Sequence, residues 1–499
     1  MLVSNRCIRG GKSRNRNFDA FFKHRQTWLV GFATGLITLV SVNSYAQFVP
    51  TNDLGMVNGT ELQQRTGNAI QAVCGGFLME TDEEMANRTV QQQDLFARCG
   101  ELVQTNNALQ DNGGLTGNSL GINESELNSA LQNVAGEEIA AAGSLATESA
   151  IGQGDLVSRR FAAILSSVTR LQVSSLNAKG AGGVLLASAG QHFGQGGNAA
   201  DSDLASEIPL GIYVNAYGGT SDKDVTDLED GFDADSAGLA IGGEYRVKSD
   251  LVLGAMLGFQ SDTVDYTTNS NVAGGGLDSD QVSLTAYGLY FSDDSYVDFV
   301  VGVGGGSYDL DRRVVIGDAD GDPNTNTFDQ TARADTDSQF TRFSLGGGKE
   351  FVRGRLTVAP FARMSLLDLR VDGYEESGAD ELNLRVNEQD INSLTIGGGA
   401  RFVGTFSTGR AIILPQFSVE WVHELRNNSR QIVSTYVNDP RNTELTLVTD
   451  DPDENYFLLG FGASAVFTNG VQIFSELRSL AGLEDISQTL LSAGLRYEF

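Results

Sequence analysis

From about residue 208 to the C-terminus, apolar and polar side chains alternate with a period of two. In the last ten residues, LLSAGLRYEF, small or apolar residues such as Leu495 and Tyr497 alternate with Arg496 and Glu498. This spacing predicts β-strands with one apolar face. Twelve such runs begin near Leu210, Ser236, Leu251, Asp280, Tyr296, Gln339, Leu356, Ile391, Ile412, Tyr456, Val471 and Ile486.

The connections between these runs alternate in length. Residues 248–250, 293–295, 353–354, 407–409 and 469–470 are tight turns, while most of the others are longer and polar. Short turns on one side and long polar loops on the other are typical of a transmembrane β-barrel with an even number of strands. We therefore expect an all-β, 12-stranded, antiparallel transmembrane barrel, in preference to a soluble β-sandwich, which would need no such asymmetry.

The alternation also predicts which side chains face lipid. In residues 236–247, Leu239, Ile241 and Tyr245 belong to the expected outer face, with Glu244 and Arg246 facing inward. Aromatic residues just before the tight turns and at the C-terminus should form an interfacial girdle. These are Tyr245, Tyr290, Phe351, Phe402, Phe467, Tyr497 and Phe499. The lumen is expected to carry acidic and basic groups that pair with each other, among them Glu244, Glu350, Glu476, Arg342, Arg363, Arg401, Arg478 and Arg496.

Residues 1–46 have the features of a secretory signal peptide. Seven basic residues precede the apolar stretch 28–42, and Ser44-Tyr45-Ala46 forms a small-x-small cleavage site. The rest of the chain keeps 27 basic against 63 acidic side chains, which argues against nucleic-acid binding. We expect an exported protein that is located in the outer membrane with its long loops outside the cell.

Residues 47–154 are expected to form a short helical region. Leu62, Thr66, Ile70 and Cys74 are spaced by four residues, as are Leu95, Cys99 and Val103. One cysteine on each helix, in an exported chain, predicts a Cys74–Cys99 disulfide. Asn123 and Glu126 form a capping pattern before a further helix.

The segment 155–207 combines a helix with a linker. Residues 155–172 carry one apolar stripe and a polar face with Arg159, Arg160 and Arg170, and residues 180–203 have the glycine-rich composition of a flexible linker. The barrel itself is expected to span residues 208–499.

The sequence offers little for catalysis, and we expect neither an enzyme nor a cofactor. After residue 46 the chain has two histidines, His192 in the linker and His423 in a barrel strand, without an evident nucleophile and acid beside them. The loop DADGDPNTNTFD places Asp318, Asp320, Asp322 and Asp329 at positions that imitate a calcium loop. Pro323 replaces the usual turn glycine, so a solvated acidic loop is favoured over weak divalent binding.

Several stretches resemble the autotransporter β-domain of Gram-negative bacteria, which belongs to type V secretion. They are APFARMSLLDLRVDGYEESGA (residues 359–379), LPQFSVEWVHEL (residues 414–425), the closing Leu495-x-Tyr497-x-Phe499, and the segment 135–164 before the barrel. The resemblance implies that the closing residues are the assembly signal, that the helix from residue 155 lies in the pore, and that residues 47–154 are a passenger.

The same resemblance implies partners: outer-membrane lipid and lipopolysaccharide, the barrel assembly machinery and periplasmic chaperones. Two features depart from the family pattern. Residues 176–205 contain only the isolated Asn177 and Asn198 in place of a self-cleaving Asn-Asn pair, and the passenger is short and helical. Two functions remain open: export and surface display of the helical region, or a channel or structural barrel that is plugged by its own N-terminal helices.

Overall fold

The computed structural model of the 499-residue chain describes residues 54–111, 113–136, 138–144, 210–268, 273–317, 328–408, 410–426, 428–451, 453–467 and 470–498, together with Thr147, Val157, Phe161 and Ile164. Several predictions lie outside the described residues. They concern the signal peptide, the linker with His192, Arg159, Arg160, Arg170, Asp318, Asp320, Asp322 and Phe499.

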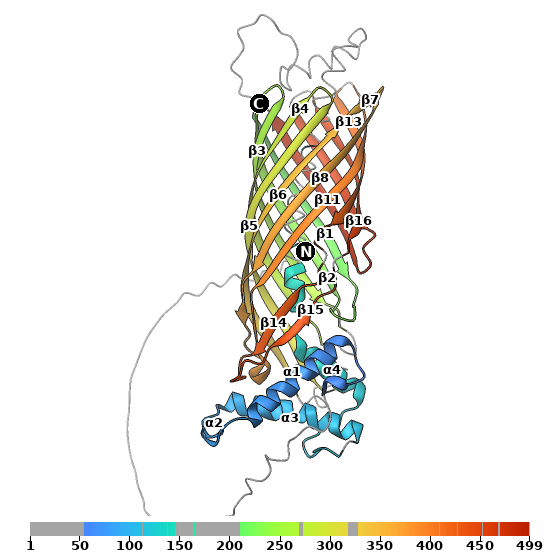
Figure 1. Ribbon diagram of the computed structural model, residues 1–499. Helices are drawn as coiled ribbons and strands as arrows, with labels where there is room; N and C mark the ends of the chain where they lie inside the picture. The colour runs from blue at the N-terminus through green and yellow to red at the C-terminus, as the bar shows by residue number, and fades with distance from the viewer. Residues whose placement is uncertain are drawn as a thin grey trace, which may run out of the picture. The chain divides into compact units, whose positions relative to one another are not determined.

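Twelve long antiparallel strands form a closed barrel (Figure 1). They are β1 (Leu210–Lys223), β2 (Phe232–Lys248), β3 (Leu251–Tyr266), β4 (Gly275–Ser292), β5 (Ser295–Ile316), β6 (Phe328–Lys349), β8 (Leu356–Val371), β11 (Gln389–Gly404), β13 (Ala411–Glu424), β16 (Asn455–Phe467), β17 (Val471–Ala481) and β18 (Ile486–Glu498). Each strand pairs with the next, and β18 pairs with β1 from Gly211↔Glu498 to Lys223↔Ile486. The predicted 12-stranded barrel is confirmed.

The outer and inner faces follow the predicted alternation. On β2, Leu239, Ile241 and Tyr245 are 38–44% exposed, whereas Glu244 is 4% exposed and faces the lumen. Tyr290, Phe351 and Tyr497 are also exposed at the end of the barrel that carries the short turns. Two short strands extend this end, β7 (Phe351–Arg353), which pairs with β8, and β12 (Phe406–Ser407), which pairs with β13.

The apolar face changes sides along the longest strands. On β5, Val297, Phe299, Val301 and Val303 point outward, but beyond Gly304-Gly305-Gly306 the residues Tyr308, Leu310, Val314 and Ile316 are buried inside. The strand does not shift register, since its pairing with β6 is continuous from Ser295↔Lys349 to Ile316↔Phe328. The outer face of the first part of β5 is apolar and suited to lipid, and that of the second part is polar and suited to water. The apolar residues of the second part lie inside and contact protein.

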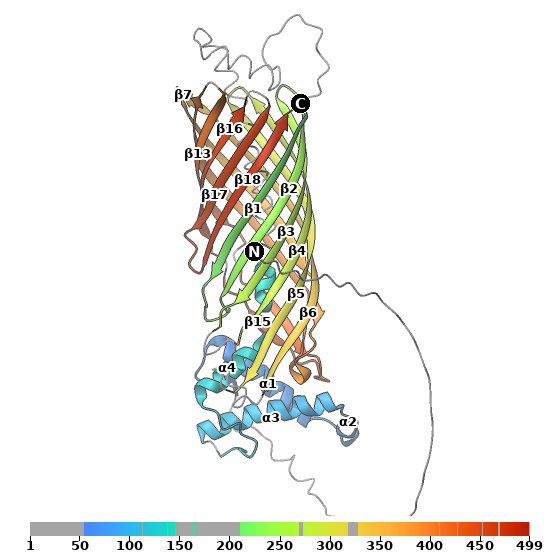
Figure 2. The same cartoon turned by 180° about the vertical axis from the view of Figure 1, so that it is seen from behind.

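Those contacts come from a helical region beside the ends of β5 and β6 that lie away from the short turns (Figures 1 and 2). It comprises the 3-10 helix η2 (Leu54–Met56) and helices α1 (Glu61–Leu78), α2 (Asp82–Ala86), α3 (Val90–Gln110) and α4 (Glu124–Ala135). All four α-helices begin with a capping box, including the predicted Asn123–Glu126 pair. None of the described helices is long and apolar enough to cross a membrane.

A second sheet of four strands lies in the long connections, in the order β15-β14-β10-β9. Its strands are β9 (Tyr374–Glu375), β10 (Leu384–Val386), β14 (Gln431–Tyr436) and β15 (Leu445–Val448), with the 3-10 helix η3 (Asp380–Leu382) between β9 and β10. The prediction that these connections are merely polar loops is wrong, because Leu384, Ile432, Tyr436 and Leu447 are buried in them. One hydrophobic core joins this sheet, the helices and the inner faces of β5 and β6.

Candidate functional site

The candidate site is the lumen together with its cover, which we call the cap: residues 54–144 and the sheet β9, β10, β14 and β15. The inner wall of the barrel has two different parts. On β1 to β5 many inward side chains form an apolar cluster, beside polar ones such as Glu244 and Asp298. Its members on these strands are Tyr213, Tyr217, Ala240, Val252, Met256, Tyr287, Leu289, Phe291, Tyr296 and Val300. The inward residues of the remaining strands are mainly polar or charged, including Arg342, Arg401, Glu420, Glu476 and Arg478.

Close packing against glycine positions two tyrosines on the apolar wall. A Cβ at Gly242 would lie 2.3 Å from the ring of Tyr213, and one at Gly254 would lie 2.2 Å from the ring of Tyr287. Both rings therefore cover backbone that only glycine leaves free. The Tyr287 hydroxyl donates to the Tyr213 hydroxyl over 3.1 Å, so neighbouring polar groups are satisfied inside the apolar patch.

A helical segment inside the barrel contacts this apolar wall. Val157, Phe161 and Ile164 are helical, are 0–3% exposed and belong to the same cluster as the luminal tyrosines. Their spacing of four and three residues places them on one face of a helix. The ring of Phe161 meets that of Tyr287 edge to face, with centroids 5.6 Å apart. These residues belong to the predicted helix 155–172, and the described part of that helix lies in the lumen.

Charged residues that the sequence predicted for the lumen pair with each other there. Arg496 Nε donates to Glu244 Oε1 over 2.6 Å, and Arg401 lies 3.8 Å from Glu350. Glu476 accepts from the amide of Gln416 over 3.1 Å. Between the charged part of the wall and Phe161 there remains a cavity of about 50 Å³, room for only a few water molecules. The lumen beside Phe161 is therefore narrow.

The end of helix α4 is held by the barrel and the cap sheet. A helix leaves its last four carbonyls without partners inside the helix. Here Arg312 of β5 donates to Asn133 O over 2.9 Å, and the Tyr436 hydroxyl of β14 donates to Val134 O over 3.2 Å. Gly136 ends the helix with φ 74°, the left-handed conformation typical of this position.

Arg312 is the centre of this contact. Its guanidinium makes a bidentate ion pair with Glu376, at 2.9 and 2.6 Å, and both side chains are 4% exposed. Glu376 also accepts from the backbone N–H of Leu384 over 2.7 Å. One buried arginine thus joins a barrel strand, the cap sheet and helix α4.

Two buried acidic residues lie close to this contact: Glu138 in the cap, and Asp230 in the connection between β1 and β2. Glu138 is 4% exposed, and its carboxylate oxygen Oε2 has no hydrogen-bond partner. Asp230 accepts from the Gln132 amide over 3.2 Å. Burial, with the negative charge of Asp230, raises the pKa of Glu138 to about 8, against the opposing effect of Arg312. Burial and Asp230 thus favour the protonated, uncharged form of Glu138.

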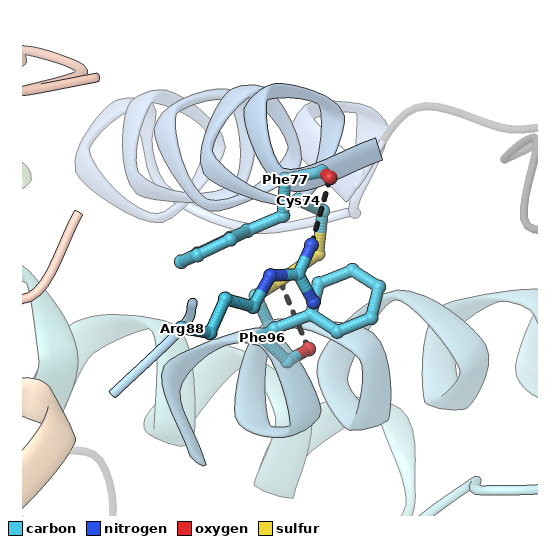
Figure 3. The surroundings of a disulfide bond; sticks show 5 residues. Cys74, Phe77, Arg88 and Phe96 are labelled. Atoms are coloured by element: carbon cyan, nitrogen blue, oxygen red, sulfur yellow. Dashed lines mark hydrogen bonds between the residues drawn. A yellow bond between two sulfur atoms is a disulfide. The ribbon is translucent and has the colours of Figure 1, made fainter. Parts of the chain in front are cut away.

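The outer part of the cap is joined by the predicted disulfide (Figure 3). Cys74 of α1 and Cys99 of α3 are bonded, and both are buried. Arg88 lies between the rings of Phe77 and Phe96, 4.9 and 4.6 Å from their centroids, and donates to Phe77 O over 2.8 Å. The predicted disulfide is confirmed.

The other sequence candidates form no reactive arrangement among the described residues. His423 stacks on Trp421 and shares Asn455 with it, each ring nitrogen lying 3.1 Å from the Asn455 oxygen. Asp329, the described member of the calcium-like loop, makes a bidentate ion pair with Arg313 instead. No group of three or more metal-ligating side chains occurs in the described part of the chain. Leu495 and Tyr497 of the predicted assembly signal point outward and are 55% and 44% exposed.

Sequence reasoning missed the Arg312 contact and the cap sheet. Arg312 and Glu376 are 64 residues apart, and Asn133 is 179 residues from Arg312, so no local spacing connects them. The buried pairs Ile432 and Tyr436, and Leu445 and Leu447, are the signal that could have revealed strands in the long connection.

Comparison with known proteins gives one family match. Residues 212–477 match the family described as the autotransporter beta-domain. Among solved structures, the chain is similar to the translocator domain of the autotransporter NalP from Neisseria meningitidis, with 16% sequence identity, coverage of 59% of this chain and 90% of that chain, and a TM-score of 0.45. It is similar to the beta domain of the Bordetella autotransporter Brka at 18% identity, with coverage of 59% and 100% and a TM-score of 0.41. No curated protein matches the chain. Because these TM-scores are low, the family assignment depends on the sequence match.

Proposed function

Because this chain belongs to the autotransporter β-domain family, we propose that its barrel anchors the protein in the outer membrane and helps to export its own N-terminal helical region to the cell surface. The exported region would remain there as a docked cap, held by the Arg312 contact and the shared core. In this proposal the short turns face the periplasm and the long connections face the outside, as in other outer-membrane barrels.

The observation that carries the proposal is the order of the chain along the barrel. Arg98 of α3 pairs with Glu381 in the long connection after β8, and Arg441 in the connection after β13 donates to Gly76 O of α1. Later in the sequence, Phe161 lies in the lumen. Leu210 then begins β1 at the end with the short turns, where it pairs with Tyr245. A chain that has moved outward through the lumen would have this order.

Accessibility on intact cells tests the proposal. An epitope inserted after Asn87, an exposed residue at the end of α2, should be labelled by antibody without permeabilisation. The matched control is the same epitope between Asp293 and Asp294 in the β4–β5 turn, which should be labelled only after permeabilisation. Labelling of the Asn87 insertion only in permeabilised cells would place the helices in the periplasm and overturn the proposal.

A second candidate function, a closed channel or structural barrel, is favoured by the narrow lumen beside Phe161. Deletion of residues 47–175 would remove both the cap helices and the inner helix, and should raise the single-channel conductance in planar bilayers several-fold. A control deletion of residues 61–110 removes α1 to α3 but leaves α4 and Phe161 in place, and should change the conductance much less. Equal conductance of the full chain and the larger deletion would exclude blockage by the N-terminal region.

We also propose that the role is non-enzymatic, and that lipopolysaccharide, periplasmic chaperones and the barrel assembly machinery are partners. Support for the first point is the contact of His423 with Asn455 and Trp421, which leaves it without a nucleophile among the described residues. Support for assembly is the outward position of Leu495 and Tyr497. A hydrolase screen on the purified chain, and crosslinking from position 495, would test the two points separately.

A further inference from the structure

Three arginines lie in two neighbouring connections at the short-turn end of the barrel. Arg353 and Arg355 form the tip of the β7–β8 hairpin, and Arg410 lies in the turn between β12 and β13. The chain that leads into the second turn contacts the first hairpin, because the backbone N–H of Thr405, just before β12, donates to Arg355 O over 2.9 Å. All three side chains are exposed. We call these residues the arginine rim.

Exposed apolar side chains lie directly beside the arginine rim. Phe351 and Leu356 are in the same hairpin and are 53% and 47% exposed, and Phe406, next to Thr405, is 49% exposed. Phe351 belongs to the aromatic girdle that marks the membrane interface. The three guanidinium groups are therefore placed where the apolar band ends and charged headgroups begin.

The arginine rim is not neutralised by the chain itself. None of its three arginines makes an ion pair with a described residue, although acidic side chains outnumber basic ones by 64 to 34 in the whole chain. Partly exposed arginines elsewhere, such as Arg65, Arg370 and Arg385, are paired with glutamates. The acidic residues beside the hairpin are engaged: Asp294 pairs with Lys349, and Glu350 faces the lumen and pairs with Arg401.

We propose that the arginine rim binds the phosphate of an anionic phospholipid headgroup in the periplasmic leaflet of the outer membrane. Guanidinium groups match phosphate oxygens through paired N–H donors. The acyl chains of the same lipid would lie along Phe351, Leu356 and Phe406. Basic residues near an anionic leaflet each contribute about 1 kcal/mol, or roughly a fivefold gain in affinity.

Native mass spectrometry of the full chain, released from detergent, tests this. Dioctanoyl phosphatidylglycerol is titrated against dioctanoyl phosphatidylcholine, which has the same tails but no net charge. The unchanged protein should prefer the anionic lipid at least tenfold. The triple variant R353Q/R355Q/R410Q should lose roughly 100-fold in affinity for phosphatidylglycerol, at about fivefold per arginine, and keep its affinity for phosphatidylcholine.

The matched control removes three partly exposed arginines elsewhere, in R65Q/R370Q/R385Q, which changes the net charge by the same amount. The control should keep the phosphatidylglycerol preference, and a loss equal to that of the rim variant would overturn the proposal. Equal affinity of the unchanged protein for both lipids would also overturn it. If inorganic phosphate at the lipid's own concentration displaces the lipid, the site is one for free phosphate and the lipid proposal fails.

Folding of each variant is checked by the heat-dependent gel mobility that intact barrels show. The single variant Arg355→Gln gives an independent measure should the triple variant fail to assemble. Its affinity for phosphatidylglycerol should fall about fivefold. An unchanged affinity in a folded R355Q protein contradicts the proposal.

Discussion

The two parts of strand β5 obey opposite rules. From Val297 to Val303 the apolar residues face outward, and from Tyr308 to Ile316 they face inward, although pairing with β6 is continuous. The outward positions of the second part are Asp309 and Asp311, which lie beside Asp335 and Arg333 of β6. The outer face of this one strand is therefore suited to lipid along its first part and to water along its second part.

The difference shows that the barrel wall has a second role. Beyond the lipid-facing part, its inner face forms one side of a hydrophobic core that the cap completes. In the first part the apolar face is satisfied by lipid and needs no protein partner. In the second part the apolar face is covered by α4 and the cap sheet, whose contacts are specific in geometry. Substitutions should accordingly have local effects that depend on which part they alter.

The largest expected effect is at Arg312, the β5 residue that holds the cap on the barrel. Replacement by methionine leaves Glu376 buried without its partner and Asn133 O without its donor, and should destabilise cap docking by about 3–5 kcal/mol. The neighbouring Arg313→Met is the control, since its pair with Asp329 is partly exposed, unlike that of Arg312, and should contribute less than about 1 kcal/mol. The stability of cap docking in the two variants is compared by measuring how readily trypsin cleaves the cap at increasing urea concentrations. Equal susceptibility of the two variants would contradict the central role of Arg312.

Removal of the Cys74–Cys99 disulfide should have the second largest effect on the stability of the cap. Its ends are 25 residues apart, and a closed loop of that length stabilises the folded state by roughly 3.5 kcal/mol. The C74S/C99S variant should lose helical signal at lower urea than the unchanged protein, while heat-dependent mobility of the barrel stays the same. Mass spectrometry of alkylated, unreduced protein should find no free thiol at Cys74 or Cys99, and finding both free would contradict the bond.

A matched pair on β5 tests the lipid boundary directly. Val301→Lys puts a charge on the lipid face and should cost about 2–3 kcal/mol of barrel stability. Asp309→Lys changes an outward residue eight positions along the same strand, and should cost much less because that residue faces water. The stabilities of the two variants are compared by measuring the fraction of each that folds into lipid vesicles at a series of urea concentrations. Similar costs would show that the apolar face does not change solvent between these positions.

The smallest expected effect is a pH dependence of the cap. Glu138 has a pKa of about 8 in the folded state, above that of an unfolded glutamate, so its contribution to stability is complete below pH of about 4.5 and is lost as the pH rises through 8. The charged groups around it are Asp230, Arg312 and Glu376. Thermal melting of the helical signal should therefore occur at lower temperature at pH 9 than at pH 6.

The variant Glu138→Gln isolates this contribution. Its amide cannot ionise, so its melting temperature should fall less between pH 6 and pH 9 than that of the unchanged protein. The same fall in both proteins would assign the pH dependence to other groups.

The barrel could be predicted in detail because every strand that faces lipid must alternate apolar outward residues with inward residues that face the lumen. Eleven of the twelve strands begin within five residues of the predicted positions, from Leu210 at β1 to Ile486 at β18. The exception is β6, which was expected near Gln339 and begins at Phe328. Its first part faces water with Arg333, Asp335 and Asp337, so the sequence there has the polarity of a loop.

The candidate site could be predicted only in part. The cysteines and helix caps are encoded by spacings of a few residues, and the luminal helical residues Val157, Phe161 and Ile164 by their apolar stripe. The cap sheet and the Arg312 contact depend on residues brought together by the closed barrel, and strands as short as β9 and β10 leave no clear period. Whether the N-terminal helices lie free or against the barrel was therefore beyond what local patterns encode.

The dependence of α4 on the barrel and the cap sheet for its last hydrogen bonds has a consequence for transport. Asn133 O and Val134 O accept from Arg312 and Tyr436, so these two carbonyls have protein donors when the helix is docked at the barrel mouth. In an export of the kind proposed, a segment arriving there would gain these bonds, and slipping back would require breaking them. The barrel mouth would then act as a ratchet, making the passage one-way without any external supply of energy.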